Sequence, residues 1–152
     1  MDFNAFEVET DKPVFVQFKN PFTGLPLFEQ MLNPDDPEGD KIDDPSKPVG
    51  VNLFGQDSEP FIKRRRFLLD KRLADAQKNG IRPMKPEDID KQNLDTVVAC
   101  IHSFTNVEWK GETLGERRDL FPHFFAKHQW AFEFCNRAIG DRANFSKASQ
   151  TG

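Results

Sequence analysis

The chain contains no tyrosine and only two cysteines, Cys100 and Cys135, among its 152 residues. Two cysteines are too few for a disulfide framework, so we expect both to be reduced thiols. No apolar run approaches the roughly 20 residues that a membrane-spanning helix needs. Residues 1–13 lack the basic and apolar stretches of a secretory signal, so none is expected. Disulfide-rich, membrane-spanning and secreted classes are therefore not favoured.

An excess of basic residues is missing as well. The chain has 21 Lys and Arg against 25 Asp and Glu, a formal net charge of −4. A general nucleic-acid-binding domain usually carries a basic excess, so that class is not favoured. Phenylalanine, in contrast, occurs 16 times. Because its ring has a large apolar area and no polar tip, we expect most of these rings to pack in a core or against a partner.

Residues 1–56 are predicted to be a small antiparallel β part. Val14, Val16 and Phe18 alternate with polar residues, which is typical of a strand with one buried face. A turn containing Pro and Gly follows, so the next segment is expected to return as a hairpin. Residues 33–48 contain four prolines and six acids against two lysines, and they are predicted to be a solvated loop. The predicted strands are residues 13–19, 25–32 and 49–54.

Residues 57–145 are predicted to form a bundle of three to four helices. Ser58 and Pro60 are typical of a helix start, and Gly80 of a helix end. A second helix begins near Pro86. Its predicted buried stripe consists of Leu94, Val97, Val98, Ile101 and Phe104.

Three further segments complete the predicted helical part. Residues 106–115 are predicted to be a turn or short hairpin around Trp109. Residues 116–139 are predicted to be helical, with Pro122 either starting or kinking the main segment. Asp141 is expected to cap a last short helix, and the tail at residues 146–152 is expected to be flexible. The sequence thus predicts one α+β domain over residues 1–152.

The pattern of potential catalytic and metal-binding residues does not indicate an enzyme. His123 and His128 are five residues apart, or roughly 140° around a helix, which is unsuitable for sharing a metal ion. Gly111 and Gly115 lack the Lys-Ser/Thr step of a phosphate-binding loop. Ser103 is a sequence neighbour of His102 without further sign of a catalytic triad. We expect no catalysis, no metal and no cofactor.

One candidate binding feature is a basic cluster within residues 61–78. It contains Lys63, Arg64, Arg65, Arg66, Lys71 and Arg72. Such a cluster either binds phosphate or an acidic partner, or forms a solvated helix face that balances the acidic loop. The sequence leaves both interpretations open.

The second candidate is the aromatic helix at residues 123–139. Its apolar residues cover roughly 200° of the helix surface, more than the ~100° that a surface helix usually buries. Either the helix lies deep in the core, or part of it meets a partner. Phe124, Trp130 and Phe134 are the predicted partner contacts, with Arg64 to Arg66 expected to steer acidic partners.

Several segments resemble the tail assembly chaperones of tailed phages. The similar C-terminal features are Phe121-Pro122, Trp130 and the string IGDRANF, which ends at Phe145. The N-terminal part is similar in DKPVFVQFKNPFTGLPL, PVGVNLFGQDSEPF and KRLADAQK, so the resemblance extends over most of the chain. The sequence departs from the family pattern between Trp109 and Phe121. Within the IGDRANF motif, Asp141 and Arg142 are expected to cap and brace the last helix and Phe145 to anchor it to the core.

The resemblance implies a non-enzymatic chaperone of tail assembly. Such a protein would bind the tape measure protein, help to recruit tail tube subunits in the host cytoplasm, and be absent from the mature virion. Self-association is possible. One alternative is a virion structural protein, such as a tail terminator or head-tail connector. Another is a nucleic-acid-binding regulator that uses the basic helix at residues 61–78.

Overall fold

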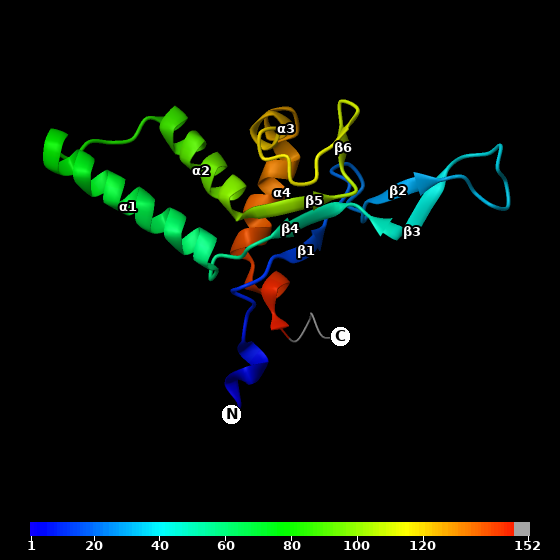
Figure 1. Cartoon of the computed structure of the whole chain (residues 1–152), viewed down its shortest axis with the longest axis horizontal. Helices are drawn as coiled ribbons and strands as arrows, with labels where there is room; N and C mark the ends of the chain where they lie inside the picture. The colour runs from blue at the N-terminus through cyan, green and yellow to red at the C-terminus, as the bar shows by residue number, and fades with distance from the viewer. Residues whose placement is uncertain (148–152) are drawn as a thin grey trace.

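Three antiparallel strands form the central sheet of the computed structural model, which describes residues 1–147 (Figure 1). The strands are β1 (Val14–Gln17), β4 (Gly50–Leu53) and β5 (Ile101–Thr105), in the order β1-β4-β5. Val51 and Leu53 are buried, whereas Asn52 lies between them on the opposite face and donates to the Ser103 and Thr105 hydroxyl oxygens (3.0 and 2.9 Å). This period of two places the core on one face of the sheet.

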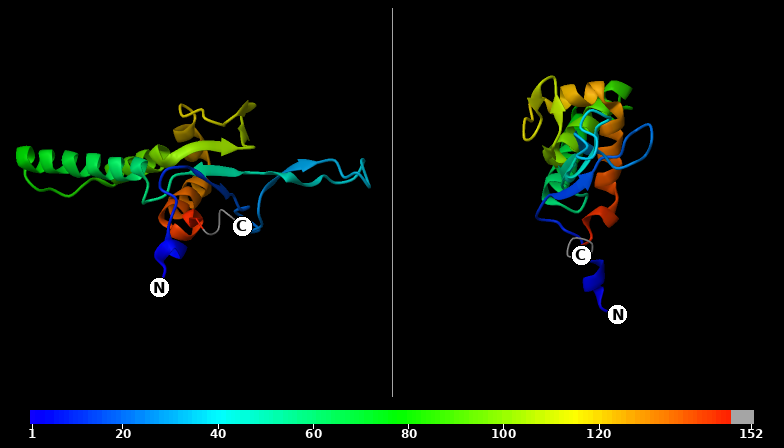
Figure 2. Two further views of the ribbon diagram at one scale, coloured as in Figure 1. Left: turned by 60° about the horizontal axis from the view of Figure 1, so that its bottom comes forward. Right: turned by 90° about the vertical axis from the view of Figure 1, so that its right-hand side faces the viewer.

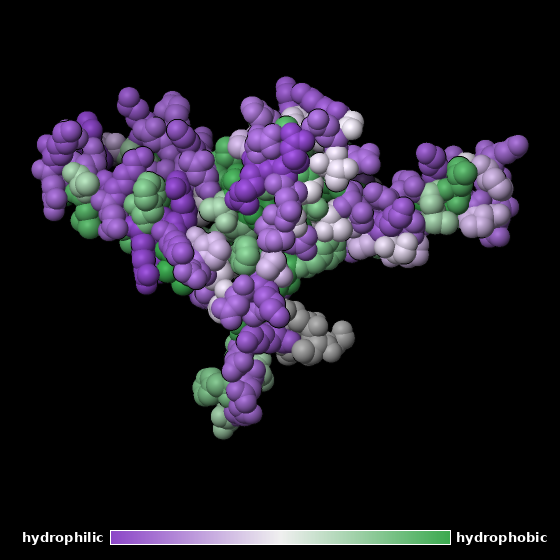
Figure 3. Space-filling model, in the orientation of Figure 1, coloured by the Kyte–Doolittle hydropathy of each residue, from purple (hydrophilic) through white to green (hydrophobic). Residues whose placement is uncertain are grey.

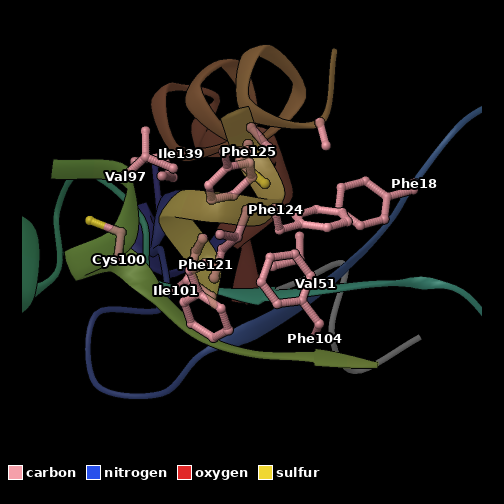
Figure 4. Close-up of a cluster of buried hydrophobic side chains, with 14 of the residues drawn as sticks. Phe18, Val51, Val97, Cys100, Ile101, Phe104, Phe121, Phe124, Phe125 and Ile139 are labelled. Carbon is pink, nitrogen blue, oxygen red and sulfur yellow. The ribbon is translucent and has the colours of Figure 1, made fainter. Parts of the chain in front are cut away.

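Helices pack on that face and enclose a core rich in phenylalanine. They are α2 (Pro86–Cys100), α3 (Phe121–Lys127) and α4 (Gln129–Gly140). The ring of Phe104 on β5 lies 4.9 Å from that of Phe121, 5.5 Å from that of Phe124 and 6.0 Å from that of Phe125, measured between centroids. Figure 4 shows these rings gathered between the sheet and the helices. The abundance of phenylalanine is thus largely explained by the core.

Two arms extend from the core in opposite directions (Figure 2). One arm consists of α1 (Glu59–Asn79) and the part of α2 beside it, and no residue of α1 is buried. The other is a hairpin of β2 (Phe28–Met31) and β3 (Ile42–Pro48). Most of the side chains of both arms are exposed to solvent.

Short elements complete the chain. The hairpin of β6 (Glu108–Trp109) and β7 (Glu112–Thr113) lies between β5 and α3 in sequence. The 3-10 helices η1 (Phe3–Phe6) and η2 (Arg142–Phe145) lie near the two ends of the described chain. Within residues 1–147, no helix is both long and apolar enough to cross a membrane.

The structure confirms the predicted α+β class, with antiparallel strands mainly in the N-terminal half and helices mainly in the C-terminal half. The strand at residues 13–19, the strand at 49–54 and the hairpin around Trp109 are all present. Ser58 is the N-cap of α1 as expected, although its hydroxyl donates to the Gly55 carbonyl oxygen (2.5 Å) and makes no side-chain cap hydrogen bond.

The predicted pairing of residues 13–19 with residues 25–32 is confirmed only next to the turn, where Lys19 bridges Pro26 and the Leu27 N–H donates to the Phe18 carbonyl oxygen (2.9 Å). Strand β1 itself pairs with β4, with Val16 opposite Val51, whereas β2 pairs with β3. The prediction that residues 33–48 form a loop is also wrong in part. Ile42–Pro48 is strand β3, which pairs with β2 in spite of its two prolines. Proline is tolerated there because β3 is an edge strand.

The second predicted helix ends earlier than expected. Helix α2 stops at Cys100, and Ile101–Thr105 forms β5 beside β4. Arg118 binds the end of this helix, because its guanidinium donates to the carbonyl oxygens of Val98 (2.5 Å) and Ile101 (2.6 Å). Ile101 and Phe104 are buried, as the stripe predicted, but as strand residues.

Most of the range predicted as helical, residues 116–139, forms the two helices α3 and α4, and Pro122 starts the first of them, which is one of the two predicted alternatives. Residues 116–120 form turns, and Pro122 lies in the first turn of α3. The helix then breaks at His128, whose backbone has φ −132° and ψ 67°. The His128 ring stacks on that of Phe124 at 4.4 Å, and its Nδ1 lies 2.9 Å from the Phe124 carbonyl oxygen. Because of this break, the predicted apolar surface of residues 123–139 is divided between α3 and α4 and is not continuous along one helix.

The predicted flexible tail is ordered at its start. Ser146 forms a β-bridge with Val8, and the backbone N–H of Lys147 donates to the Glu7 carbonyl oxygen (3.1 Å). The remaining residues of that predicted tail, 148–152, lie outside the described part of the chain.

Candidate protein-binding groove

A surface hollow of about 760 Å³ lies between the edge strand β1 and helix α4. We call it the β1–α4 groove. Val16, Gln17, Lys19, Asn20 and Pro21 line one side. The opposite side and the end consist of Trp130, Glu133, Phe134, Arg137, Ala138, Asp141 and Asn144. Two of the three predicted aromatic contacts, Trp130 and Phe134, therefore line one groove.

Trp130 and Phe134 are held in place by a buried ring beneath them. They are four residues apart on α4 and therefore lie on the same face of the helix. Phe18, which is 1% exposed, lies 5.7 Å from the ring of Trp130 and 5.1 Å from that of Phe134, in edge-on geometry. The rings of Trp130 and Phe134 remain partly exposed. The groove thus has a rigid aromatic wall with apolar surface still available.

The opposite wall is an open sheet edge. The Phe18 N–H donates to the Val49 carbonyl oxygen (2.9 Å). Because every second residue of a strand directs its N–H and C=O groups to the same side, Val16 and Val14 also direct theirs toward β4. Phe15 and Gln17 direct theirs to the other side. Within residues 1–147, the N–H groups of Phe15 and Gln17 have no hydrogen-bond partner. An extended peptide can add to such an edge as a further strand.

The rim of the groove carries charges of both signs. Lys19 and Arg137 are basic, whereas Glu133 and Asp141 are acidic. Within the described residues, Lys19, Glu133 and Arg137 form no ion pair with the rest of the chain. A polar rim around an apolar floor is typical of reversible protein interfaces.

The structure removes Phe124 from the predicted contact surface. Its side chain is only 5% exposed and packs against Phe104, Trp109 and His128. The prediction that Phe124 meets a partner is therefore wrong. The reason is the break at His128, which places Phe124 on α3, facing the sheet, while Trp130 and Phe134 follow on α4.

The predicted basic contacts lie away from the groove. Arg64, Arg65 and Arg66 are on α1, which extends away from α4 (Figure 1). The guanidinium of Arg64 pairs with Asp95 of α2 (3.5 Å) and lies 5.0 Å from the Phe67 ring centroid. Arg65 and Arg66 are exposed. The predicted aromatic contacts and the predicted basic contacts therefore lie on separate parts of the molecule.

Asp141, Arg142 and Phe145 of the IGDRANF motif make contacts that hold the end of the chain in place. Asp141 accepts from the Ala143 N–H (3.0 Å) as the N-cap of η2. Arg142 donates two hydrogen bonds to Asp57 (2.7 and 3.0 Å), and this pair holds the pKa of the Asp57 carboxyl below its usual value. Phe145 is buried against Gly55. The motif therefore fastens the chain after α4 to the loop before α1.

Cys100 and Cys135 are buried free thiols. Burial raises the pKa of the Cys100 thiol to about 12 and also raises that of Cys135, so both thiols stay protonated. His102 Nδ1 lies 2.9 Å from the Ser103 hydroxyl, but both are neighbours on the exposed side of β5. Within residues 1–147, no three His, Cys, Asp or Glu side chains are grouped to hold a metal ion.

Sequence reasoning missed the strand side of the groove. The alternation of residues 13–19 predicted a strand with one buried face, but it carried no signal for which edge of that strand stays unpaired. Comparison with known proteins adds no further guide, because no family model matches this chain and no curated protein or solved structure is significantly similar to it.

Proposed function

We propose that the protein is a non-enzymatic phage tail assembly chaperone, which binds the tape measure protein and helps to recruit tail tube subunits in the host cytoplasm. The sequence resemblance suggests the family. The observation that supports a holding function is the β1–α4 groove, with an open strand edge on one side and partly exposed Trp130 and Phe134 on the other. These features suit the capture of an unfolded or extended apolar segment.

The mechanism is physical. A client segment adds to the edge of β1, where the free backbone groups of Phe15 and Gln17 supply hydrogen bonds that do not depend on client sequence. Every second client side chain then points toward Trp130 and Phe134, so apolar residues at that spacing are preferred. The charged rim keeps the complex soluble and reversible, which allows a polymerising subunit to displace the chaperone.

The test uses Gln17, because one position separates backbone from side-chain effects. Gln17→Pro removes the free N–H, and it also removes the side-chain hydrogen bond from Nε2 to the Leu27 carbonyl oxygen (2.7 Å). Gln17→Ala removes only that side-chain bond and is the matched control. Each variant is co-expressed with the tape measure protein encoded beside it, and the soluble complex is measured by pull-down.

We expect wild type and Gln17→Ala to keep the tape measure protein soluble. Gln17→Pro should capture at least about tenfold less of it in the pull-down. Trp130→Ala should have a similar effect, and Phe22→Ala, at a highly exposed ring outside the groove, should have none. Equal capture by all variants would refute the groove as the binding site. Mass spectrometry of purified virions tests the alternative of a structural protein, since a chaperone should be absent from them.

A further inference from the structure

Helix α1 carries an apolar stripe that begins at the half-buried Ile62 and continues in the exposed Leu69 and Leu73. On a helical projection Ile62, Leu69 and Leu73 fall within an arc of about 40°. Leu69 is 50% exposed and Leu73 is 62% exposed. Figure 3 shows this arm as mainly hydrophilic, interrupted by separate hydrophobic residues. We call this stripe, together with the arginines that border it, the outer face of α1.

The outer face is distinct from the side of α1 that packs on α2. That inner side is marked by the Arg64–Asp95 ion pair (3.5 Å) and by the partly buried Phe61 and Leu68. The centre of the stripe lies about 100–160° around the helix from these residues. Intramolecular packing therefore does not explain why Leu69 and Leu73 are apolar.

Arginines border the stripe on both sides. Arg65 and Arg72, seven residues apart, lie on one border, and Arg66 lies on the other. None of the three forms an ion pair within residues 1–147. Helix α1 has seven basic residues against three acidic ones, in a chain whose net charge is −4. Arg65, Arg66 and Arg72 thus border the apolar stripe, with Asp70 beside Arg66, whereas Lys71 and Lys78 lie on the far side of this net basic helix.

We infer that the outer face of α1 docks an amphipathic helix of another protein whose apolar stripe is bordered by Asp and Glu. Leucine side chains of the two helices pack together, and the bordering carboxylates lie against Arg65, Arg66 and Arg72. This surface is additional to the β1–α4 groove and does not rest on the proposed function. It differs from the groove in accepting a helix and in selecting for charge.

Charge and composition exclude other occupants of the same face. A second copy of α1 would place arginines against arginines, which is unfavourable. Nucleic acid would engage the arginines but leave Leu69 and Leu73 in water. An anionic membrane surface would require a wider apolar face than these few aliphatic side chains provide.

The test measures binding of labelled synthetic helices to the full-length protein by fluorescence anisotropy. One probe is an alanine-based helix with a leucine stripe bordered by Glu, and the matched probe has Lys in place of Glu. We expect the acidic helix to bind, with affinity that falls as salt is raised, and the basic helix to bind at least about tenfold more weakly. Equal binding of the two helices would overturn the inference.

Matched variants locate the binding to the outer face. Arg65→Glu with Arg66→Glu should weaken binding of the acidic helix at least about tenfold. The control is Lys71→Glu with Lys78→Glu, which changes the net charge equally on the far side of α1 and should have a much smaller effect. An equal loss in both double variants would show a general charge effect and refute a defined face.

A second pair of variants tests the apolar part. Leu69→Ser with Leu73→Ser should weaken the acidic helix at least about tenfold without lowering Tm, because both side chains are largely exposed. Retention of full affinity in that variant would overturn the inference. A short DNA duplex and vesicles of one part phosphatidylserine to three parts phosphatidylcholine serve as competitors. Tighter binding of either than of the acidic helix would also overturn it.

Discussion

The contact between Gly55 and Phe145 gives a quantitative test of the fold at the end of the IGDRANF motif. Phe145 is 3% exposed, and a Cβ built on Gly55 would lie 2.8 Å from its Cδ2 and 3.0 Å from its Cε2. Gly55 is not among the glycines with positive φ, so its backbone conformation suits alanine. The substitution Gly55→Ala therefore acts through the ring of Phe145 and not through backbone strain.

The structure determines both the sign and the size of the expected effect. The added methyl group would clash with the buried Phe145 ring, so Gly55→Ala should lower the free energy of unfolding by about 1–3 kcal/mol. Removal of the ring in Phe145→Ala should cost about 3–5 kcal/mol and leave space beside residue 55. In that background Gly55→Ala should be neutral or stabilising by about 0.4–1 kcal/mol, because alanine restricts the unfolded chain. The double variant should therefore be more stable, by at least about 1 kcal/mol, than the sum of the two single effects predicts.

The assay is urea unfolding followed by the fluorescence of Trp109 and Trp130, which are both partly buried. For a chain of this size, about 1 kcal/mol corresponds to roughly 2–4 °C in Tm, so thermal melts provide a second measurement. If Phe145→Ala does not fold, Phe145→Leu gives the same cycle with a smaller cavity. Additivity of the two substitutions within about 0.5 kcal/mol would refute the contact as described.

Three further predictions concern other parts of the fold. Arg118→Ala should lower the unfolding free energy by about 1.5–3 kcal/mol in urea melts, because two carbonyl oxygens at the end of α2 lose a charged donor, and Arg118→Lys should recover only part of it. Arg142→Ala should lower Tm near neutral pH. Arg142 lowers the pKa of Asp57 in the folded state. The Tm difference between wild type and the variant should therefore be largest above pH about 4, the pKa of Asp57 in the unfolded chain, and should disappear as the pH falls through the lower pKa of the folded state. The thiols of Cys100 and Cys135, buried with raised pKa values, should react with Ellman's reagent at pH 8 only at the rate of opening or unfolding, and rapid labelling of the native protein would contradict their burial.

The parts of the fold that sequence reasoning predicted correctly are those determined by local signals. The period of two in β1 and the Ser-Glu-Pro start of α1 are each contained within a few residues. Asp141 at the start of η2 is a similar local cap. Such signals do not depend on which distant segment becomes the neighbour.

The errors arose where a distant partner determined the structure. Ile101–Thr105 continues the helical stripe of α2 in sequence, yet it becomes β5 because β4 offers an edge and Phe104 pairs with Val51. Of the three predicted aromatic contacts, Trp130 and Phe134 are partly exposed and line the β1–α4 groove. Phe124 was misplaced because nothing in the sequence pattern revealed the break at His128, which depends on tertiary packing around that ring.

The prolines of β3 have a consequence for the behaviour of the protein in concentrated solution. The β2–β3 arm extends from the core, and both of its strands are edge strands. Exposed edge strands can pair with those of neighbouring molecules and so promote aggregation. Pro45 and Pro48 supply no N–H, and the neighbouring Asp43, Asp44 and Lys47 add charge. These features are expected to disfavour pairing between the arms of neighbouring molecules, so the arm can be long and exposed without promoting aggregation.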